Sequence, residues 1–158
     1  MIELCNTMQC TTFFGKKKEI SDDKITLRPA AYGVVLHEGK ILLVRTKHTS
    51  KYFFPGGGME QGENLEQCLR REMKEETGIE ICDISLLHFN ESFFYYDPLD
   101  EAFHCFSFFF LCKSKSLSLK GQADDTECEK PCWVDLNQLK EEDFQPPGGE
   151  VLKLVMNL

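Results

Sequence analysis

The sequence of 158 residues contains no long run of apolar residues. A helix that crosses a bilayer needs about 18 or more consecutive, mainly apolar residues, and no window approaches that length. The first ten residues also lack a basic leader followed by a continuous apolar stretch. The sequence therefore predicts no membrane partner and a cytoplasmic location.

Positive charge is scarce. The chain has 18 Lys and Arg against 26 Asp and Glu, which gives a formal net charge of −8. Binding to a nucleic acid polymer depends on neutralising its phosphates with basic side chains. We therefore expect no general affinity for nucleic acid, and an anionic ligand must instead be met by a few local cations.

A second cysteine pair at zinc-ligand spacing is also missing. Cys128 and Cys132 are spaced as half of such a site, but no other pair matches them. Without a secretory leader, the eight cysteines are better interpreted as reduced thiols than as four disulfides. Four of them lie in apolar-periodic segments, which predicts core packing: Cys68, Cys82, Cys105 and Cys112.

What the chain does have is enough apolar material for one core. Hydrophobic residues make up 42% and aromatic residues 11% of the sequence, which suits a single domain without repeats. Residues 1–29 are polar and rich in lysine, so we expect an N-terminal arm or edge strand. Residues 30–158 would then form the main domain.

Strand patterns dominate that domain. Apolar runs on either side of a glycine turn, from Ala31 to Arg45, predict a β-hairpin, and 46–52 reads as a polar loop. The run Pro-Gly-Gly-Gly at 55–58 predicts a break in regular structure. Further strands are expected at 79–89, 93–96, 103–112 and 133–134, with a loop at 114–130 and a helix at 149–158. Two helices against many strands predict an α+β fold with a mixed, curved sheet between helices.

One helix carries an unusual charge pattern. Asn64 is a suitable N-cap with Gln67 three residues on, as in a capping box, and Gly78 ends the helix. On a helical wheel Glu72 and Glu76 project into the apolar stripe, with Glu75 at its border; that stripe is formed by Leu65, Cys68, Leu69 and Met73.

Three carboxylates at positions i, i+3 and i+4 repel one another, and partial burial adds a desolvation cost. A solvated charge run is the simpler interpretation of an acidic helix, but the wheel argues against it here. Oxygen-rich clusters suit hard divalent ions such as Mg²⁺ or Mn²⁺. Arg71, one turn before Glu75, could orient that carboxylate through a salt bridge. The preceding glycines, which alone would indicate a flexible loop, let the backbone approach an ion or phosphate closely.

This segment matches the Nudix box at every fixed position, so the chain resembles the Nudix hydrolase family. The matching residues are Gly57, Glu63, Arg71, Glu72, Met73, Glu75, Glu76, Gly78 and Ile79. The hairpin before the box, the lead-in at 55–57 and Trp133-Val134-Asp135 also look like the family, so the resemblance spans about 30–158.

The resemblance implies the Nudix fold and hydrolysis of a nucleoside diphosphate linked to a group X. It also implies that Glu72, Glu75 and Glu76 bind the metal with the Gly57 carbonyl, and that Arg71 belongs to the catalytic set. Glu63 would support Arg71. The general base stays open, and Glu127 and Glu129 are either a further ligand or base, or part of a solvated acidic loop.

Residues outside the box should set specificity. Arg28 is a candidate for contact with a phosphate or with a base edge. Phosphate contacts are also expected from Arg45, Lys47, His48 and Lys51, although a solvated face fits these four equally well. Tyr95 and Tyr96 either stack on a nucleobase or belong to a strand that packs on the core.

Pro98 lies a few residues late for the proline that ADP-ribose-specific relatives tend to carry, which weakens ADP-ribose without excluding it. The leading expectation is hydrolysis of a nucleoside triphosphate or dinucleoside polyphosphate, by a monomer or a possible homodimer. The alternatives are a catalytically silent nucleotide-sensing module, which would normally show a broken box, and a purely structural domain.

Overall fold

The structure, a computed structural model, describes residues 6–120 and 129–158. Within them one sheet has the strand order β2-β1-β7-β8-β3-β4-β5, while β6 pairs with β3 and β9 with β4. The strands are β1 (Thr7–Thr12), β2 (Lys17–Ser21), β3 (Ile25–His37), β4 (Lys40–Arg45), β5 (Tyr52–Phe53), β6 (Gly56–Gly58), β7 (Ile81–Tyr96), β8 (Glu101–Ser114) and β9 (Cys132–Asp135). The α-helices are α1 (Leu65–Thr77) and α2 (Gly148–Met156), and short 3₁₀ turns occupy Asp22–Lys24, Asp97–Leu99, Leu136–Gln138 and Glu141–Asp143.

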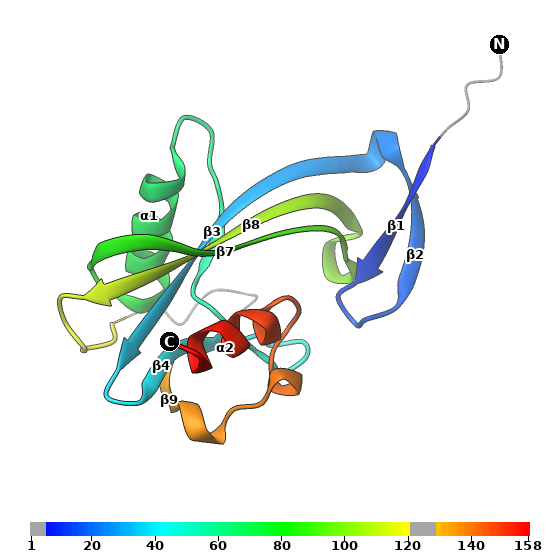
Figure 1. The fold of residues 1–158 in the computed structure, drawn as a ribbon. Coiled ribbons are helices and arrows are strands. Elements are labelled where there is room, and N and C mark those ends of the chain that lie inside the picture. The colour runs from blue at the N-terminus through cyan, green and yellow to red at the C-terminus, as the bar shows by residue number, and fades with distance from the viewer. Residues whose placement is uncertain (1–5, 121–128) are drawn as a thin grey trace, which may run out of the picture.

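The two helices cover opposite faces of the sheet (Figure 1). Successive side chains of a strand point to opposite faces, and β3 illustrates this. Ala31 and Val35 belong to the apolar cluster that contains α1, whereas Ala30 and Val34 belong to the cluster that contains α2. The sheet is mixed, because β3 is parallel to β8 but antiparallel to β4. The predicted α+β class with a curved sheet between helices is confirmed.

Strands β7 and β8 form a long hairpin that curves away from α1 (Figure 1). The prediction of separate strands at 79–89 and 93–96 is wrong, because polar Asn90 and Ser92 are paired with Ser107 and Cys105. Backbone hydrogen bonds between strands do not depend on side-chain polarity. Register shifts between Cys82 and Ser85, and between Leu86 and His88, interrupt the ladder instead.

The glycine segment pairs with β3 as strand β6, so the predicted break there is also wrong. Gly56 nevertheless has a φ of +146°, and a Cβ at this position would lie 2.2 Å from the carbonyl oxygen of Ala31. Only glycine fits such an approach.

The N-terminal residues form a β1–β2 hairpin whose first strand runs parallel to the end of β7, with Thr11 opposite Phe94. The division of the chain at residue 29 stays a prediction, and β3 runs across that position without interruption. Among the described residues, neither helix has the length and apolar character that a bilayer-crossing helix needs.

Candidate active site

Helix α1 begins and ends as its sequence predicts. The Asn64 side chain accepts a hydrogen bond from the Gln67 N–H (2.9 Å), and the Gln67 side chain accepts one from the Asn64 N–H (2.8 Å). Gly78 adopts a left-handed conformation with a φ of +73°. These contacts fix the start and end of the helix and therefore the rotation of its acidic residues.

The glutamates of α1 differ in their surroundings. The Glu72 side chain is 16% exposed and that of Glu75 is 60% exposed. Burial raises the pKa of the Glu72 carboxyl above its usual value, although the Arg71 guanidinium opposes that shift. Glu72 also packs against Gly57, where a Cβ would lie 2.7 Å from its Oε1. A glycine at 57 is therefore required for this carboxylate to lie so close to the backbone.

Arg71 is the centre of the charge network on α1. Its Nη2 and Nε donate to the two carboxylate oxygens of Glu63 at 2.6 and 3.0 Å. Its Nη1 donates to Glu72 (2.7 Å) and Glu75 (3.3 Å), and its Nη2 also reaches the Gly58 carbonyl at 3.2 Å. Hydrogen bonds from Arg71 lower the pKa of Glu63 to about 2, and those same bonds raise the pKa of Arg71. The network holds α1 against the glycine segment.

Glu76 connects the helix to the same glycine segment from its other end. The Gly56 N–H donates to Glu76 Oε2 at 2.8 Å. The predicted metal donors Glu72 and Glu76 therefore each contact the β6 backbone, while the Gly57 carbonyl accepts a hydrogen bond from the Cys68 thiol at 3.4 Å.

The donor set suits a hard divalent cation. Carboxylate and carbonyl oxygens are the ligands that Mg²⁺ and Mn²⁺ take. Within the described ranges, no three acidic, His or Cys side chains already converge as a closed cation cage. Mg²⁺ usually keeps several waters and binds through one or two carboxylates together with substrate phosphates, so an open arrangement fits it.

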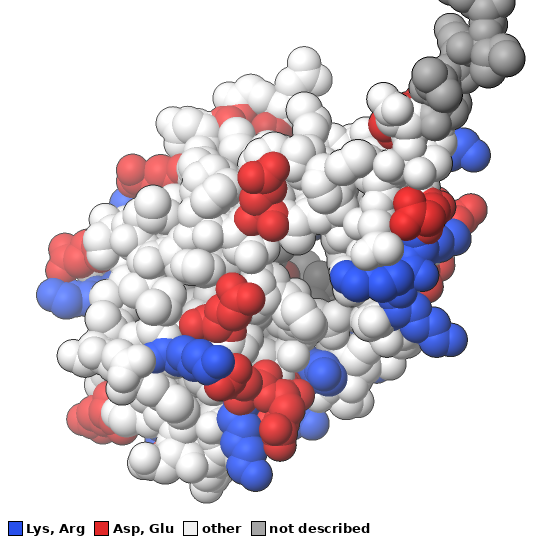
Figure 2. All heavy atoms as spheres, turned by 45° about the vertical axis from the view of Figure 1, so that its right-hand side comes forward, with Lys and Arg blue, Asp and Glu red and all other residues white. Residues whose placement is uncertain are grey.

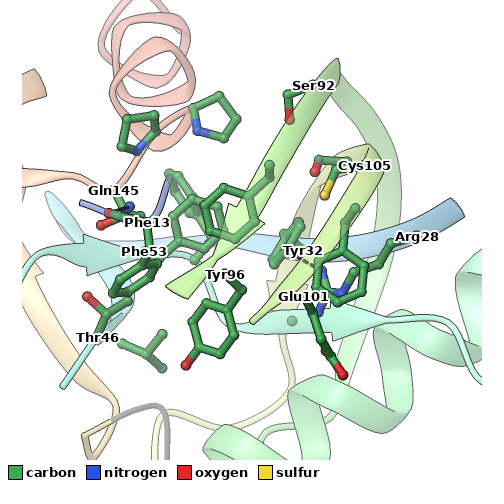
Figure 3. A pocket seen from close by; sticks show the side chains of 18 of the residues that line it. Phe13, Arg28, Tyr32, Thr46, Phe53, Ser92, Tyr96, Glu101, Cys105 and Gln145 are labelled. Carbon is green, nitrogen blue, oxygen red and sulfur yellow. Dashed lines mark hydrogen bonds between the residues drawn. The ribbon is translucent and has the colours of Figure 1, made fainter. Parts of the chain in front are cut away.

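A cavity of about 370 Å³ opens beside this acidic edge, and both Gly56 and Glu76 line it. Much of the remaining wall is aromatic, as Figure 3 shows. The aromatic lining residues are Phe13, Tyr32, Phe53, Phe54, Phe94, Tyr96 and Phe103. Part of the acidic edge of α1 and β6 and several flat apolar surfaces thus line one cavity.

Two of the predicted substrate contacts line this cavity, namely Arg28 and Tyr96. The Arg28 side chain extends along β6, where a Cβ at Gly58 would lie 3.4 Å from its Nε, and its Nη1 donates to the Tyr32 hydroxyl at 3.5 Å. It belongs to the wall that also contains Gly56 and Glu76, and Figure 3 shows it beside Tyr32.

The structure places three other predicted contacts away from this cavity. Tyr95 is buried against Cys10 and Ala102, since alternation along β7 turns it away from the Tyr96 side. Arg45 donates from Nη2 to the Tyr52 hydroxyl at 2.5 Å. Lys51 lines a neighbouring cavity.

Of the remaining candidates from the sequence, those that the structure describes do not line this cavity. Lys47 and His48 are exposed, and the His48 ring contacts Phe13 with centroids 6.0 Å apart. The Glu129 N–H donates to the Arg45 carbonyl at 2.8 Å and its side chain is exposed, whereas Glu127 lies outside the described residues.

Sequence reasoning missed much of the cavity wall. Phe13, Phe103 and Gln145 lie far apart in the chain and share no pattern, so only the fold brings them together. The one available signal was the pair Phe13-Phe14 in an otherwise polar segment.

The charge on this side of the molecule is unevenly distributed. Figure 2 shows a hollow with a cluster of Lys and Arg beside its right-hand edge, where Asp and Glu also lie, and with Asp and Glu prominent on its left. The β1–β2 hairpin carries the exposed run Lys16 to Lys18.

The family model for the NUDIX domain matches residues 26–155. The chain is 33% identical over 129 residues to an ADP-ribose pyrophosphatase of Methanocaldococcus jannaschii, covering 78% of this chain and 72% of that protein. It is 29% identical over 140 residues to an 8-oxo-dGTP diphosphatase of Haemophilus influenzae, covering 85% of this chain and 95% of that protein. The fold also matches the crystal structure of a MutT NUDIX hydrolase from Burkholderia pseudomallei with a TM-score of 0.67 at 22% identity, covering 82% and 98%.

Fold, acidic helix and glycine segment together define a hydrolase of the pyrophosphohydrolase class. The chain belongs to the Nudix family.

Proposed function

We propose that this enzyme is a divalent-metal-dependent hydrolase that cleaves a phosphoanhydride bond in a nucleoside diphosphate linked to a group X. A nucleoside triphosphate or dinucleoside polyphosphate is the leading substrate. The observation that carries the proposal is that Glu76 and Gly56 line the aromatic cavity, so a nucleobase in the cavity would have its phosphates beside the acidic helix.

Mg²⁺ or Mn²⁺ held by Glu72, Glu75, Glu76 and the Gly57 carbonyl would neutralise charge on the phosphoryl oxygens and lower the pKa of the attacking water. The side chains of the protein would position these carboxylates and accept the proton of the attacking water. Arg71 fixes Glu72 and Glu75, and Glu63 anchors Arg71. A carboxylate accepts the proton from the attacking water.

Substrate recognition then falls to the cavity wall. Arg28, between β6 and the cavity, would meet a phosphate oxygen, since a guanidinium fork matches phosphate geometry. Tyr96 would offer a face to the nucleobase. Of the two tyrosines named as candidates, Tyr96 is the one we propose, and Arg45 and Lys51 would contribute charge farther from the reacting phosphates.

ADP-ribose is the second candidate, because the Methanocaldococcus relative is named as an ADP-ribose pyrophosphatase. We further infer that the enzyme acts on free nucleotides rather than on nucleic acid polymers, since the net charge is −8. The cytoplasmic location stays a prediction. Sedimentation would distinguish a monomer from the possible homodimer.

The test is a product-resolved hydrolysis screen with Mg²⁺ or Mn²⁺ and chelator controls. The panel contains ATP, GTP, 8-oxo-dGTP, diadenosine tetraphosphate and ADP-ribose. Turnover that chelator abolishes and Glu76→Gln suppresses supports the proposal, and the products name the bond. Tight nucleotide binding without turnover of any member would instead favour the silent sensing module.

A further inference from the structure

Phe13 belongs to the β1–β2 hairpin, which precedes the part of the chain that matches the family model. Phe13 is only 8% exposed and forms part of the cavity wall together with Phe94 and Tyr96. The ring centroids lie 5.3 Å from Tyr96 and 6.2 Å from Phe94, in edge-on orientations. An element outside the matched domain thus supplies one aromatic wall of the candidate substrate cavity (Figure 3).

The backbone of Phe13 is held by three different groups. Its N–H donates both to the Tyr95 carbonyl (2.9 Å) and to Asp97 Oδ2 (2.8 Å). Its carbonyl accepts from Gln145 Nε2 at 3.0 Å, and Gln145 Oε1 in turn accepts from the Thr49 hydroxyl at 3.1 Å. The ring is therefore positioned before a ligand arrives, which reduces the entropic cost of binding against it.

A second cavity of about 370 Å³ lies on the other side of this wall. The two cavities share Phe13, Ser92, Phe94, Gln145, Pro146 and Pro147. The hairpin lines much of the second cavity through Thr11, Phe14 and Gly15. Asn90 also lines it, and its buried Oδ1 has no hydrogen-bond partner among the residues described. The second cavity is thus space that a group attached to the base would reach if the Phe13 ring were absent.

We propose that Phe13 is a specificity-determining residue, which sets the size of the site for a planar heterocyclic base and excludes nucleotides with a bulky group on the base. This inference rests on the proposed function, because it places the base in the aromatic cavity. Removal of the ring would take away a stacking or edge contact and would join the first cavity to the second.

The experiment compares wild type, Phe13→Ala and Phe14→Ala. Phe14 is the matched control, because it is the neighbouring phenylalanine, is 56% exposed and lines only the second cavity. For each hydrolysed nucleotide of the panel, kcat and KM are measured beside a bulky analogue, N6-benzyl-ATP for adenine or N2-benzyl-GTP for guanine.

Phe13→Ala should raise KM for the unmodified nucleotide at least about fivefold, as expected when an aromatic contact to a base is lost. It should also reduce the preference for the unmodified over the benzylated nucleotide at least about tenfold. Phe14→Ala should leave both quantities near wild type. Circular dichroism and thermal unfolding check the fold. If the alanine variant unfolds, it is replaced by Phe13→Val, which keeps some apolar packing but has neither the flat ring nor its volume.

Wild-type KM and selectivity in a folded Phe13 variant would overturn the inference while leaving the proposed function intact. Equal effects of Phe13→Ala and Phe14→Ala would do the same. If the wild type hydrolyses no panel member, calorimetric titration with AMP and GMP in chelator decides. Weaker binding of the nucleotide to the Phe13 variant than to wild type supports the proposed role of Phe13. Equal binding to both proteins, or no binding to the wild type, overturns it.

Discussion

At the scale of single residues, the acidic positions of α1 have separate tasks. Glu72 packs against Gly57, Glu76 accepts a hydrogen bond from the Gly56 N–H, and Glu75 is largely exposed. Repulsion among the three carboxylates is only partly offset by Arg71, and a cation would offset more of it. Substitutions that change charge but not shape can therefore separate catalysis from folding.

Glu76→Gln should lower kcat at least about a hundredfold while the fold stays intact. Glutamine keeps a side-chain oxygen that can accept the Gly56 N–H, so the change removes charge rather than the contact to β6. Steady-state kinetics and thermal unfolding measure the two effects. Glu66→Gln, on the exposed face of the same helix, is the control, and near-normal turnover of the Glu76 variant would refute the metal assignment.

Glu63 gives a pH-dependent prediction. Its folded-state pKa of about 2 lies below the usual value of 4.5, so the ionised carboxylate stabilises the fold at pH values above about 4.5. That contribution should be lost as pH falls from 4.5 toward 2. The Tm of wild type should thus exceed that of Glu63→Gln at pH 7, and the difference should shrink on acidification. A Tm difference independent of pH would exclude this role for the Arg71 ion pair.

At the scale of elements, strand β7 assigns opposite roles to adjacent tyrosines. Tyr96 lines the cavity, whereas Tyr95 is buried with Cys10 and Ala102, and its hydroxyl donates to Asp100. Alternation along the strand is the cause. In helix α1 the helical repeat likewise decides which side chains are buried, and Leu69 and Met73 lie on its buried face.

Tyr96→Ala should therefore raise KM about tenfold with little change in stability, because a base contact is removed. Tyr95→Ala should instead lower the free energy of unfolding by about 3 kcal/mol, as for other large-to-small core substitutions. Kinetics and urea denaturation of the two variants test this separation. A larger KM effect for Tyr95 than for Tyr96 would contradict the orientation of β7.

At the scale of the whole molecule, the cavity is lined by residues of the N-terminal hairpin, the acidic helix and the segment that precedes the C-terminal helix. Phe13, Glu76 and Gln145 come from distant parts of the chain. The described cysteines are free, and Cys10, Cys68, Cys105 and Cys112 are buried. Burial raises the pKa of the Cys68 thiol to about 11 and that of Cys112 to about 12.

Thiol titration should count all eight cysteines in denaturant without added reductant, since we expect no disulfides. In the native protein at pH 8, the buried thiols should react slowly, because the thiolate is the reactive form. Ellman's reagent with mass spectrometry of the labelled peptides measures both. A denatured count below eight would reveal a disulfide, and fast labelling of Cys68 or Cys112 would contradict their burial.

The sequence by itself determined the elements whose causes are local. The capping box at Asn64, the left-handed Gly78 and the apolar stripe of α1 all follow from spacing, and the same spacing placed Glu72 and Glu76 on the buried side. The Nudix box predicted the family, because its residues lie within a single loop and helix.

Only the tertiary structure decided what depends on contacts between distant segments. Because β7 pairs with β8, it continues as one strand through its polar middle residues, and because Gly56 to Gly58 pair with β3, they form a strand. The cavity likewise takes Phe13 from an N-terminal hairpin and Gln145 from the segment before α2. No local pattern encodes such neighbours, because they are selected by the free energy of packing the whole chain and not by the propensity of any one segment.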